Sequence, residues 1–145
     1  MVFTTGSATE TEKIGERLCK ALLARGDTHA FISMRGEMGV GKTAFVRGFA
    51  RALGISGVKS PTYTIVNEHH GERRLYHFDM YRISDPDDLY SIGYDDYVSA
   101  EGFCIAEWSE NIEQELPPWH IDVTIERTDG CPDGRKIKIS DGIQI

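Results

Sequence analysis

One eight-residue segment constrains the fold of this chain more than any other feature. Residues Gly36 to Thr43 fit the phosphate-binding P-loop pattern G-x-x-x-x-G-K-[ST]. The glycines of such a loop let the backbone curl, so that successive N–H groups point at phosphate oxygens. Lys42 is expected to be exposed in the absence of a nucleotide and to reach the β- and γ-phosphates when one binds, and the Thr43 hydroxyl is expected to bind Mg²⁺. The predicted phosphate-binding residues are Glu37, Met38, Gly39, Val40, Gly41, Lys42 and Thr43.

The segments on either side of the loop favour the same interpretation. Residues 29–34 are mostly apolar and end at the loop, as a buried parallel strand would. Residues 44–53 have a helical pattern, in which Phe45, Phe49 and Leu53 recur at every fourth position. A helix that begins at such a loop adds its positive amino-terminal end to the anion site. The order of strand, loop and helix is therefore the one that phosphate binding requires.

The remaining patterns predict a mixed sheet with helices on its faces. An amphipathic helix is expected over residues 9–25, with Thr9 and Glu12 as a capping box. Asp85 and Pro86 are expected to begin a short helix. The other expected elements are a hairpin of strands at 63–68 and 74–79, a buried strand at 103–106, a helical turn at 109–115, and paired strands at 121–125 and 136–139. Together they indicate a small α/β P-loop NTPase fold in one domain, residues 1–145.

Composition indicates the cellular setting. No apolar run approaches the roughly 18 residues that a membrane span needs, and no basic segment followed by an apolar one begins the chain. The cysteines, Cys19, Cys104 and Cys131, show no C-x-x-C spacing. We therefore expect a cytoplasmic protein with reduced thiols, no membrane contact and no zinc site, with Cys104 in the core.

The charge of the chain bears on its partners. The formal net charge is −7 at pH 7, and the sequence pI is about 5.2. A surface of that sign repels a phosphate backbone. Binding of nucleic acid by this chain alone is therefore disfavoured.

Two carboxylates follow apolar strands and are candidates for metal binding and chemistry. The apolar run 103–106 leads into Glu107, which we expect to hold Mg²⁺ with Thr43; the alternative is an ordinary acidic residue at a strand end. Asp79 also ends an expected strand, and an acid there would orient or deprotonate the attacking water. Trp108 has three open interpretations: a core residue, a partner surface, or a ring near the nucleotide.

A third candidate is the short segment that follows the P-loop helix. It reads Ser60-Pro61-Thr62, and the proline favours an extended conformation at Ser60. In switch-type NTPases a hydroxyl at this point of the chain senses the γ-phosphate and the metal. The alternative is a plain turn.

These motifs together resemble the bacterial tRNA threonylcarbamoyladenosine-biosynthesis ATPase family, TsaE. The segments that carry the resemblance are 36–43, 58–64, 76–82, 85–86, 92–93 and 107–108. The resemblance implies ATP as the nucleotide and Mg²⁺ as the metal, held by Thr43 and Glu107. It places Lys42, Asp79, Ser60 and Thr62 in hydrolysis, together with the H-x-D-x-Y-R segment at 77–82. Ser7 and Thr11 resemble the family's amino-terminal nucleotide contact.

The resemblance also implies a process and partners. It implies an ATPase that acts with a kinase-like threonylcarbamoyl-transferase catalytic subunit and the paralogue of that subunit. Their product is N6-threonylcarbamoyladenosine at position 37 of tRNAs that read ANN codons, and ATP hydrolysis would reset the complex. Because the chain is acidic, we expect tRNA to reach it only through the complex.

Three other classes of protein are alternatives to an ATPase of this family. A GTPase should carry D-x-x-G and N-K-x-D, and neither occurs in the sequence. A small-molecule P-loop kinase needs an acceptor site and a lid, for which one compact domain leaves little room. A non-catalytic nucleotide-sensing subunit remains an alternative to an ATPase.

Overall fold

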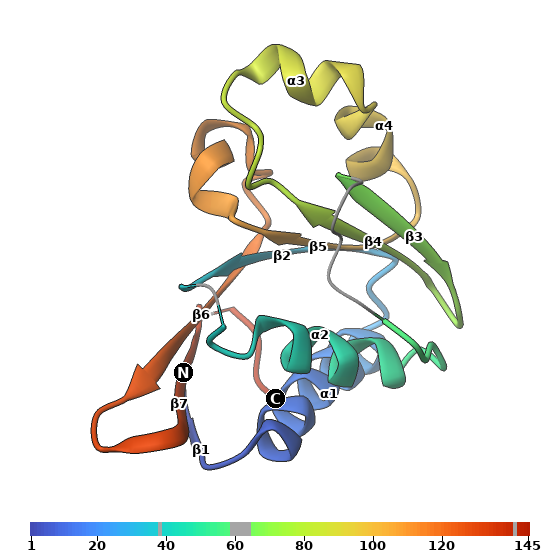
Figure 1. Cartoon of the computed structure of the whole chain (residues 1–145). Coiled ribbons are helices and arrows are strands. Elements are labelled where there is room, and N and C mark those ends of the chain that lie inside the picture. Colours follow the sequence, from blue (N-terminus) through green and yellow to red (C-terminus); the bar gives the residue numbers. More distant parts are fainter. Residues whose placement is uncertain (38, 59–64, 141) are drawn as a thin grey trace.

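The computed structural model describes residues 1–37, 39–58, 65–140 and 142–145, and its centre is a mixed seven-stranded sheet (Figure 1). The order of strands across the sheet is β1-β7-β6-β2-β5-β4-β3. Strand β2 pairs in parallel with β5 and β6, and β4 pairs in parallel with β5. The strands are β1 (Val2–Thr5), β2 (His29–Arg35), β3 (Val66–His70), β4 (Arg74–Asp79), β5 (Gly102–Glu107), β6 (Ile121–Thr128) and β7 (Cys131–Ile139).

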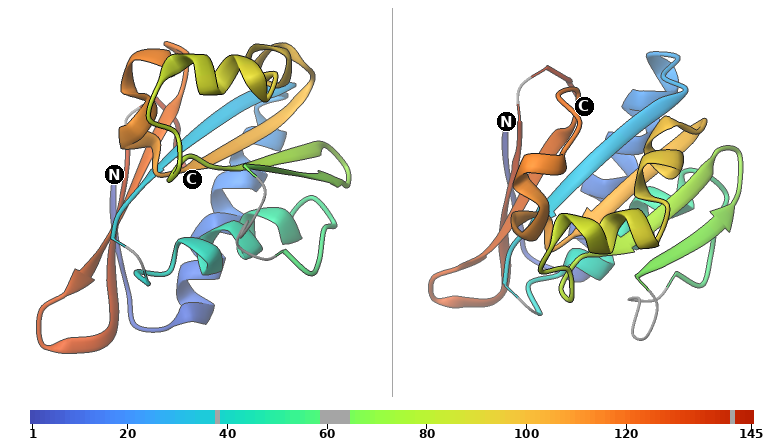
Figure 2. Two further views of the ribbon diagram at one scale, coloured as in Figure 1. Left: turned by 45° about the horizontal axis from the view of Figure 1, so that its top comes forward. Right: turned by 90° about the horizontal axis from the view of Figure 1, so that it is seen from above.

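Helices cover both faces of the sheet. They are α1 (Ala8–Ala24), α2 (Lys42–Arg51), α3 (Pro86–Ser91), α4 (Tyr94–Ser99) and the 3₁₀ helix η1 (Ser109–Glu115). Figures 1 and 2 show α1 and α2 on one face, and α3, α4 and η1 on the other. None of the described helices is both long and apolar enough to cross a membrane.

Alternation along the central strands divides the core between these two layers. On β5, Phe103 and Ile105 pack with α1 and α2, whereas Cys104 and Ala106 pack on the opposite side. All six residues of β5 are buried, as expected of a central parallel strand. Burial raises the pKa of the Cys104 thiol to about 12, so the thiol stays protonated and packs as an apolar group, as the sequence predicts.

Helices α1 and α2 cross so closely that only glycine fits at the contact. A Cβ atom on Gly48 would lie 1.8 Å from the carbonyl oxygen of Glu12, and one on Gly15 would lie 2.1 Å from that of Phe45. Around this crossing, Arg47 and Arg51 of α2 form ion pairs with Glu12 of α1. Because α2 begins inside the P-loop, its contact with α1 fixes where the loop sits.

The predicted fold is confirmed, with differences at element ends. The hairpin of β3 and β4, the buried strand β5 and the pair β6–β7 form as expected. The predicted capping box is wrong: Ser7 caps α1 by accepting from the Glu10 N–H at 3.2 Å, and Glu12 instead binds α2. Strand β1 was not expected, because its partner β7 is distant in the sequence. Residues 63 and 64 of the expected first hairpin strand lie outside the described residues.

Gly48→Ala should destabilise the fold although alanine favours helices. The gain in helix propensity is at most about 1 kcal/mol, whereas overpacking against the α1 backbone costs about 1–3 kcal/mol or more. We expect a Tm lowered by several degrees and weaker nucleotide binding. Gly6→Ala is the control, because a Cβ there meets only the Glu10 carboxylate at 3.4 Å. Equal melting temperatures of the two variants would contradict the tight crossing.

Candidate functional site

A hollow of about 590 Å³ lies at the carboxyl ends of β2, β4 and β5. Parallel strands bring their following residues to one edge, which is where open α/β sheets bind ligands. In the parallel register, Glu107 lies opposite both Met34 of β2 and Asp79 of β4. The lining residues are Ala8, Gly39, Gly41, Lys42, Thr43, Ala44, Arg47, Asp79, Glu107 and Trp108.

The P-loop has the backbone that phosphate binding needs. Gly39 and Gly41 have φ angles of 78° and 105°, which L residues with a side chain rarely adopt. Gly41 is the N-cap of α2, and no side chain caps that helix end. The amino-terminal N–H groups of α2 therefore face the hollow without a side-chain cap, as an anion site requires.

Lys42 is buried, contrary to the expectation that it would be exposed. Only 6% of the surface of the residue is exposed, and its Nζ atom donates to the carbonyl oxygen of Gly36 at 2.9 Å. Nζ also lies 4.6 Å from the centre of the Trp108 ring. The ammonium folds back because these two contacts replace water around it. It must leave them to reach a phosphate.

Trp108 is therefore near the predicted nucleotide site, the third of its open interpretations. It is half-buried, and its ring centre lies 5.0 Å from that of Tyr81. Among the described residues it alone combines a side chain with a positive φ, of 60°. A bulky residue in this conformation is strained, and such strain collects at functional sites. The turn aims the ring over Lys42.

Glu107 is held by a histidine. His77 is fully buried, and its Nε2 lies 2.5 Å from Oε2 of Glu107. The Nδ1 atom of His77 is also buried and has no hydrogen-bond partner among the described residues. His77 and Asp79 are two residues apart on β4, so both side chains point to the same face. The resemblance places His77 in the H-x-D-x-Y-R segment, but its contact with Glu107 was not predicted from the sequence.

Asp79 lines the hollow directly beside Glu107. One of its oxygens, Oδ1, accepts the backbone N–H of Tyr81 at 3.0 Å, which fixes the carboxylate at the end of β4. Two acids with different partners thus stand side by side: Glu107 on a buried imidazole and Asp79 on a backbone turn. The arrangement suits one acid for metal binding and the other for a water molecule.

The β6–β7 hairpin supports the P-loop from the side. Arg135 of β7 donates from Nε to the carbonyl oxygen of Val40 at 2.6 Å. Arg127 of β6 forms an ion pair with Glu37 at 3.3 Å. Because both of those side chains are exposed, the second contact is worth little on its own. No local pattern in the sequence identifies either arginine as a P-loop contact.

The other predicted site residues are only partly placed. Ser7 caps α1 next to Ala8 of the hollow, and Thr11 is buried with its hydroxyl 2.8 Å from that of Thr5. Their contact with a nucleotide stays a prediction. Met38, Ser60 and Thr62 lie outside the described residues.

The donor set at the hollow fits Mg²⁺ bound together with nucleotide phosphates. Within the described residues, no three His, Cys, Asp or Glu side chains are grouped as a metal cluster. Mg²⁺ at phosphate sites is held by one or two protein oxygens, with the phosphates and water completing the shell. Thr43, Asp79 and Glu107 line the hollow with side-chain oxygens of this kind, and the assignment of the metal to Thr43 and Glu107 stays a prediction.

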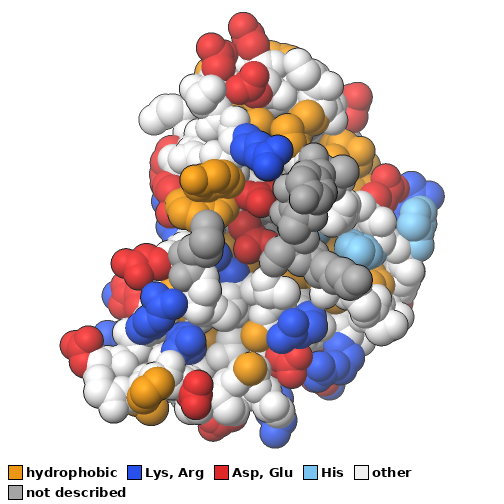
Figure 3. All heavy atoms as spheres, in the orientation of Figure 1, with side chains coloured by type: hydrophobic (Ala, Val, Ile, Leu, Met, Phe, Trp, Pro, Cys, Tyr) orange, Lys and Arg blue, Asp and Glu red, His pale blue; other side chains and the backbone are white. Residues whose placement is uncertain are grey.

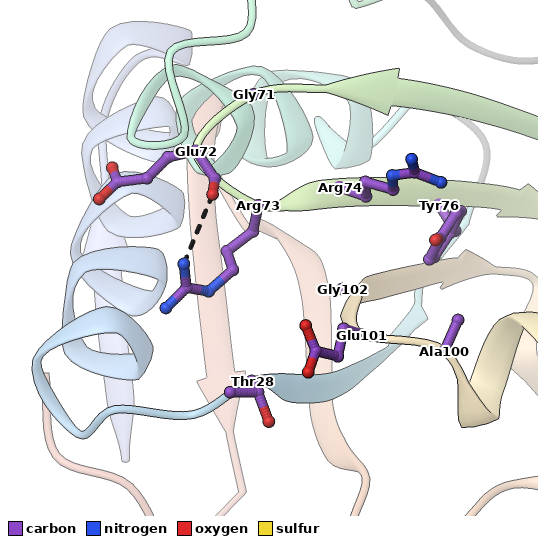
Figure 4. Close-up of a pocket in the computed structure, with 9 residues that line it drawn as sticks. All are labelled: Thr28, Gly71, Glu72, Arg73, Arg74, Tyr76, Ala100, Glu101 and Gly102. Atoms are coloured by element: carbon purple, nitrogen blue, oxygen red, sulfur yellow. Dashed lines mark hydrogen bonds between the residues drawn. The ribbon is translucent and has the colours of Figure 1, made fainter.

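A second hollow, of about 580 Å³, lies at the opposite edge of the sheet (Figure 4). It is lined by the amino ends of β4 and β5, with Arg73 and Arg74 near Glu72 and Glu101. No P-loop glycine lines it, and its two glutamates offset the charge of its two arginines. The nucleotide site is therefore assigned to the carboxyl edge.

Comparison with known proteins identifies the family. The family model described as "Threonylcarbamoyl adenosine biosynthesis protein TsaE" matches residues 5–137. The chain belongs to the TsaE family. The tRNA threonylcarbamoyladenosine biosynthesis protein TsaE of Bacillus subtilis is 38% identical over 125 residues, which are 85% of this chain and 75% of that protein. Its Haemophilus influenzae counterpart is 37% identical over 130 residues, covering 88% of this chain and 80% of that protein.

A solved structure agrees with this membership. The crystal structure of YdiB from Bacillus subtilis matches with a TM-score of 0.78 and 31% sequence identity. The match covers 98% of this chain and 86% of that chain. The α/β fold and the resemblance to the TsaE family are thereby confirmed.

Lys42→Ala should weaken ATP binding and also cost some stability. A hydrogen bond to a charged group is worth about 1.5–3 kcal/mol, so affinity should fall roughly ten- to a hundredfold. Loss of the contacts with Gly36 and Trp108 should lower the free energy of unfolding by about 1 kcal/mol. Calorimetric ATP titration and thermal unfolding measure the two effects, with the exposed Lys20→Ala as control. Unchanged ATP affinity in a folded Lys42→Ala variant would contradict the P-loop assignment.

Proposed function

We propose that this chain is a cytoplasmic Mg²⁺-dependent ATPase of the machinery that installs N6-threonylcarbamoyladenosine at position 37 of tRNAs reading ANN codons. One observation carries the proposal: Lys42, Glu107 and Asp79 line the same hollow at the P-loop. The printed names of the relatives support the process, because they describe tRNA threonylcarbamoyladenosine biosynthesis proteins.

ATP binding uses the loop and the start of α2. The curled backbone around Gly39 and Gly41 presents N–H groups to the phosphates, and the amino end of α2 adds its partial positive charge. Lys42 leaves the carbonyl of Gly36 and neutralises charge on the β- and γ-phosphates. Thr43 and Glu107 would hold Mg²⁺, which supplies Lewis-acid stabilisation of charge on the phosphate oxygens.

Hydrolysis needs a water molecule aligned with the γ-phosphate. Asp79 orients this water or accepts its proton, because its carboxylate lines the hollow without a cationic partner among the described residues. His77 keeps the neighbouring Glu107 turned toward the hollow. In this division of roles the two acids are not interchangeable. Ser60 and Thr62 are proposed to sense the γ-phosphate from the segment after α2.

The chain is proposed to act within a complex. Its partners are a threonylcarbamoyl-transferase catalytic subunit and the paralogue of that subunit. Beyond the P-loop core, no described element forms a lid over the hollow, so a docked partner is needed to exclude water. A net charge of −7 makes unaided capture of tRNA unfavourable, and tRNA arrives through the partners.

A nucleotide-sensing subunit without hydrolysis is the second candidate. One observation favours it: Lys42 rests on Gly36 and Trp108, so nucleotide binding alone would rearrange the site. Phosphate release measured with ATP and GTP, with and without the partners, separates the candidates. Hydrolysis of ATP that the partners accelerate supports the ATPase, and its absence in every mixture supports the sensor.

Substitutions at the two acids should have different effects. Glu107→Ala should raise the Mg²⁺ concentration for half-maximal activity by more than about tenfold, because it removes a metal-side carboxylate. Asp79→Asn should keep nucleotide binding and lose turnover by about 10²- to 10⁴-fold, because it removes the group that acts on water. Mg²⁺ titrations of ATP binding and of phosphate release measure both. The assignment of the acids is reversed if Asp79→Asn shifts the Mg²⁺ requirement instead.

Nucleotide state should change the affinity for the partner subunits. Coupling between two ligands of one protein is typically about 5- to 150-fold, and by linkage the partners change ATP affinity by the same factor. We expect tighter partner binding with a non-hydrolysable ATP analogue than with ADP. The measurement is partner affinity with the analogue, with ADP and without nucleotide. Identical affinities in all three states would contradict the proposed coupling.

A further inference from the structure

The charges of this chain are unevenly distributed along the sequence. Residues 83–126 include twelve Asp and Glu residues and neither Lys nor Arg, although the chain as a whole has 16 Lys and Arg against 23 Asp and Glu. All 16 positive side chains therefore lie in the other two parts of the chain, where they outnumber the acids. The net charge of −7 conceals an acidic part and a basic part.

The acidic stretch forms a layer of the structure. It contributes α3, α4 and η1, which cover one face of the sheet, together with β5 and most of β6. On the face shown in Figure 3, acidic side chains gather at the end that carries α3, and Lys and Arg lie mainly toward α1, α2 and the β6–β7 hairpin. The polarity is therefore spatial as well as sequential.

Between α3 and η1 this layer contains a groove of about 210 Å³. Ile83, Leu89 and Ile112, all buried, contribute apolar side chains to its lining. Exposed acids, Asp85, Glu110 and Glu115, lie along it. The groove thus combines an apolar lining with a negatively charged margin.

The acids of the groove lack internal counterions. Within the described residues, Asp85, Glu110 and Glu115 form no ion pair with a lysine or arginine, and only Glu113 of the lining does so, with Arg35. The basic side of the molecule differs, because Arg47, Arg51 and Lys20 are paired with glutamates of α1. Within the described residues, several positive side chains of the α1–α2 face thus have internal partners, whereas these three acids of the groove have none of opposite charge.

An exposed aromatic side chain stands beside the groove. Tyr90 of α3 is 72% exposed, and it lines a small neighbouring hollow with Leu89, Pro86 and Tyr94. Tyrosine is enriched at protein interfaces because it buries a large area at low entropic cost. Tyr90 therefore presents an exposed ring beside the negatively charged margin of the groove, where an apolar side chain of a partner could pack.

We propose that the groove between α3 and η1 docks a segment of a partner protein in which lysine or arginine side chains flank an apolar residue. The positive side chains meet Asp85, Glu110 and Glu115, and the apolar residue packs against the lining and Tyr90. Electrostatic complementarity of this kind sets the rate and the specificity of association. The inference rests on the proposed function, because the partner is taken to be a subunit of the proposed complex.

Other occupants fit the groove less well. A nucleic acid or an anionic membrane would bring phosphates to an acidic margin, which opposes binding. A second copy of this chain would have to present its basic α1–α2 face, where Arg47 and Arg51 are already paired with Glu12. A protein with unpaired positive side chains meets neither objection.

The groove is joined to the nucleotide site by hydrogen bonds. Asn111 lines the groove, and its side-chain amide donates to the carbonyl oxygens of Met80 at 2.9 Å and Tyr81 at 3.3 Å. Its backbone N–H donates to the carbonyl oxygen of Trp108 at 3.1 Å. A partner in the groove therefore contacts the segment that holds Tyr81 and Trp108 over Lys42, which would let it respond to the nucleotide.

The test is the affinity of the purified partner subunits for charge-reversed variants, measured by surface plasmon resonance at several salt concentrations. Glu110→Lys combined with Glu115→Lys changes the net charge from −7 to −3, since each swap adds two charges. Asp129→Lys with Asp133→Lys, on the β6–β7 hairpin, makes the same change elsewhere. We expect the groove variant to lose at least tenfold in affinity and to show a weaker salt dependence, with the control within twofold of the unmodified chain.

A second pair of variants tests the apolar anchor. Tyr90→Ser should lose at least fivefold in partner affinity without a change in Tm, because the ring is mostly exposed; Trp119→Ser, at 48% exposure on another surface, should not. ATP binding should be unchanged in all four variants.

Equal partner affinity of the groove variants and the controls overturns the docking site and leaves the proposed function standing. Absence of partner binding by the unmodified chain overturns both. Self-association abolished by the Glu110→Lys and Glu115→Lys pair assigns the groove to a second copy and overturns the partner.

Discussion

The parallel pairing of β5 with both β2 and β4 is the constraint on which the rest of the structure depends. It aligns Glu107 with Asp79 of β4 and with Met34 near the end of β2, just before the P-loop. Three segments that are distant in sequence therefore meet at one edge of the sheet. Because β5 is buried along its whole length, a shift in register would place apolar side chains at that edge and carboxylates in the core. The hydrophobic pattern of one strand therefore fixes the chemistry of the site.

The P-loop itself is supported from two sides. On one side α2 rests on α1 through Gly15 and Gly48, at backbone contact distance. On the other, Arg135 of β7 holds the carbonyl of Val40. Lys42 then closes the loop through its hydrogen bond to the Gly36 carbonyl and lies against the ring of Trp108, a residue whose backbone is strained. In the proposed function, nucleotide binding exchanges the contacts of Lys42 with Gly36 and Trp108 for contacts with phosphate.

Much of this could be predicted from the sequence, because the relevant patterns are local. Fewer than ten consecutive residues define each of three features: the P-loop, the apolar strand that ends at Glu107, and the helix cap at Asp85. The features that escaped prediction depend on distant partners. Burial of Lys42 needs Trp108, the role of Arg135 needs the return of β7, and the glycine crossing needs two helices in contact. His77 is predictable only in part. Its position two residues before Asp79 predicts which face of the strand it lies on, but it does not predict the contact with Glu107.

The pairing of β1 with β7 has a consequence for biosynthesis. Val2 to Thr5 align with residues 135–138, so strand β1 finds its neighbour only after those distant residues have been translated. Arg135, which braces the P-loop, emerges from the ribosome at the same late moment. A nascent chain thus carries its complete G-x-x-x-x-G-K-T segment long before Arg135 is available to brace it. Contacts of such long sequence separation also slow folding, which makes the terminal strand a late step in maturation.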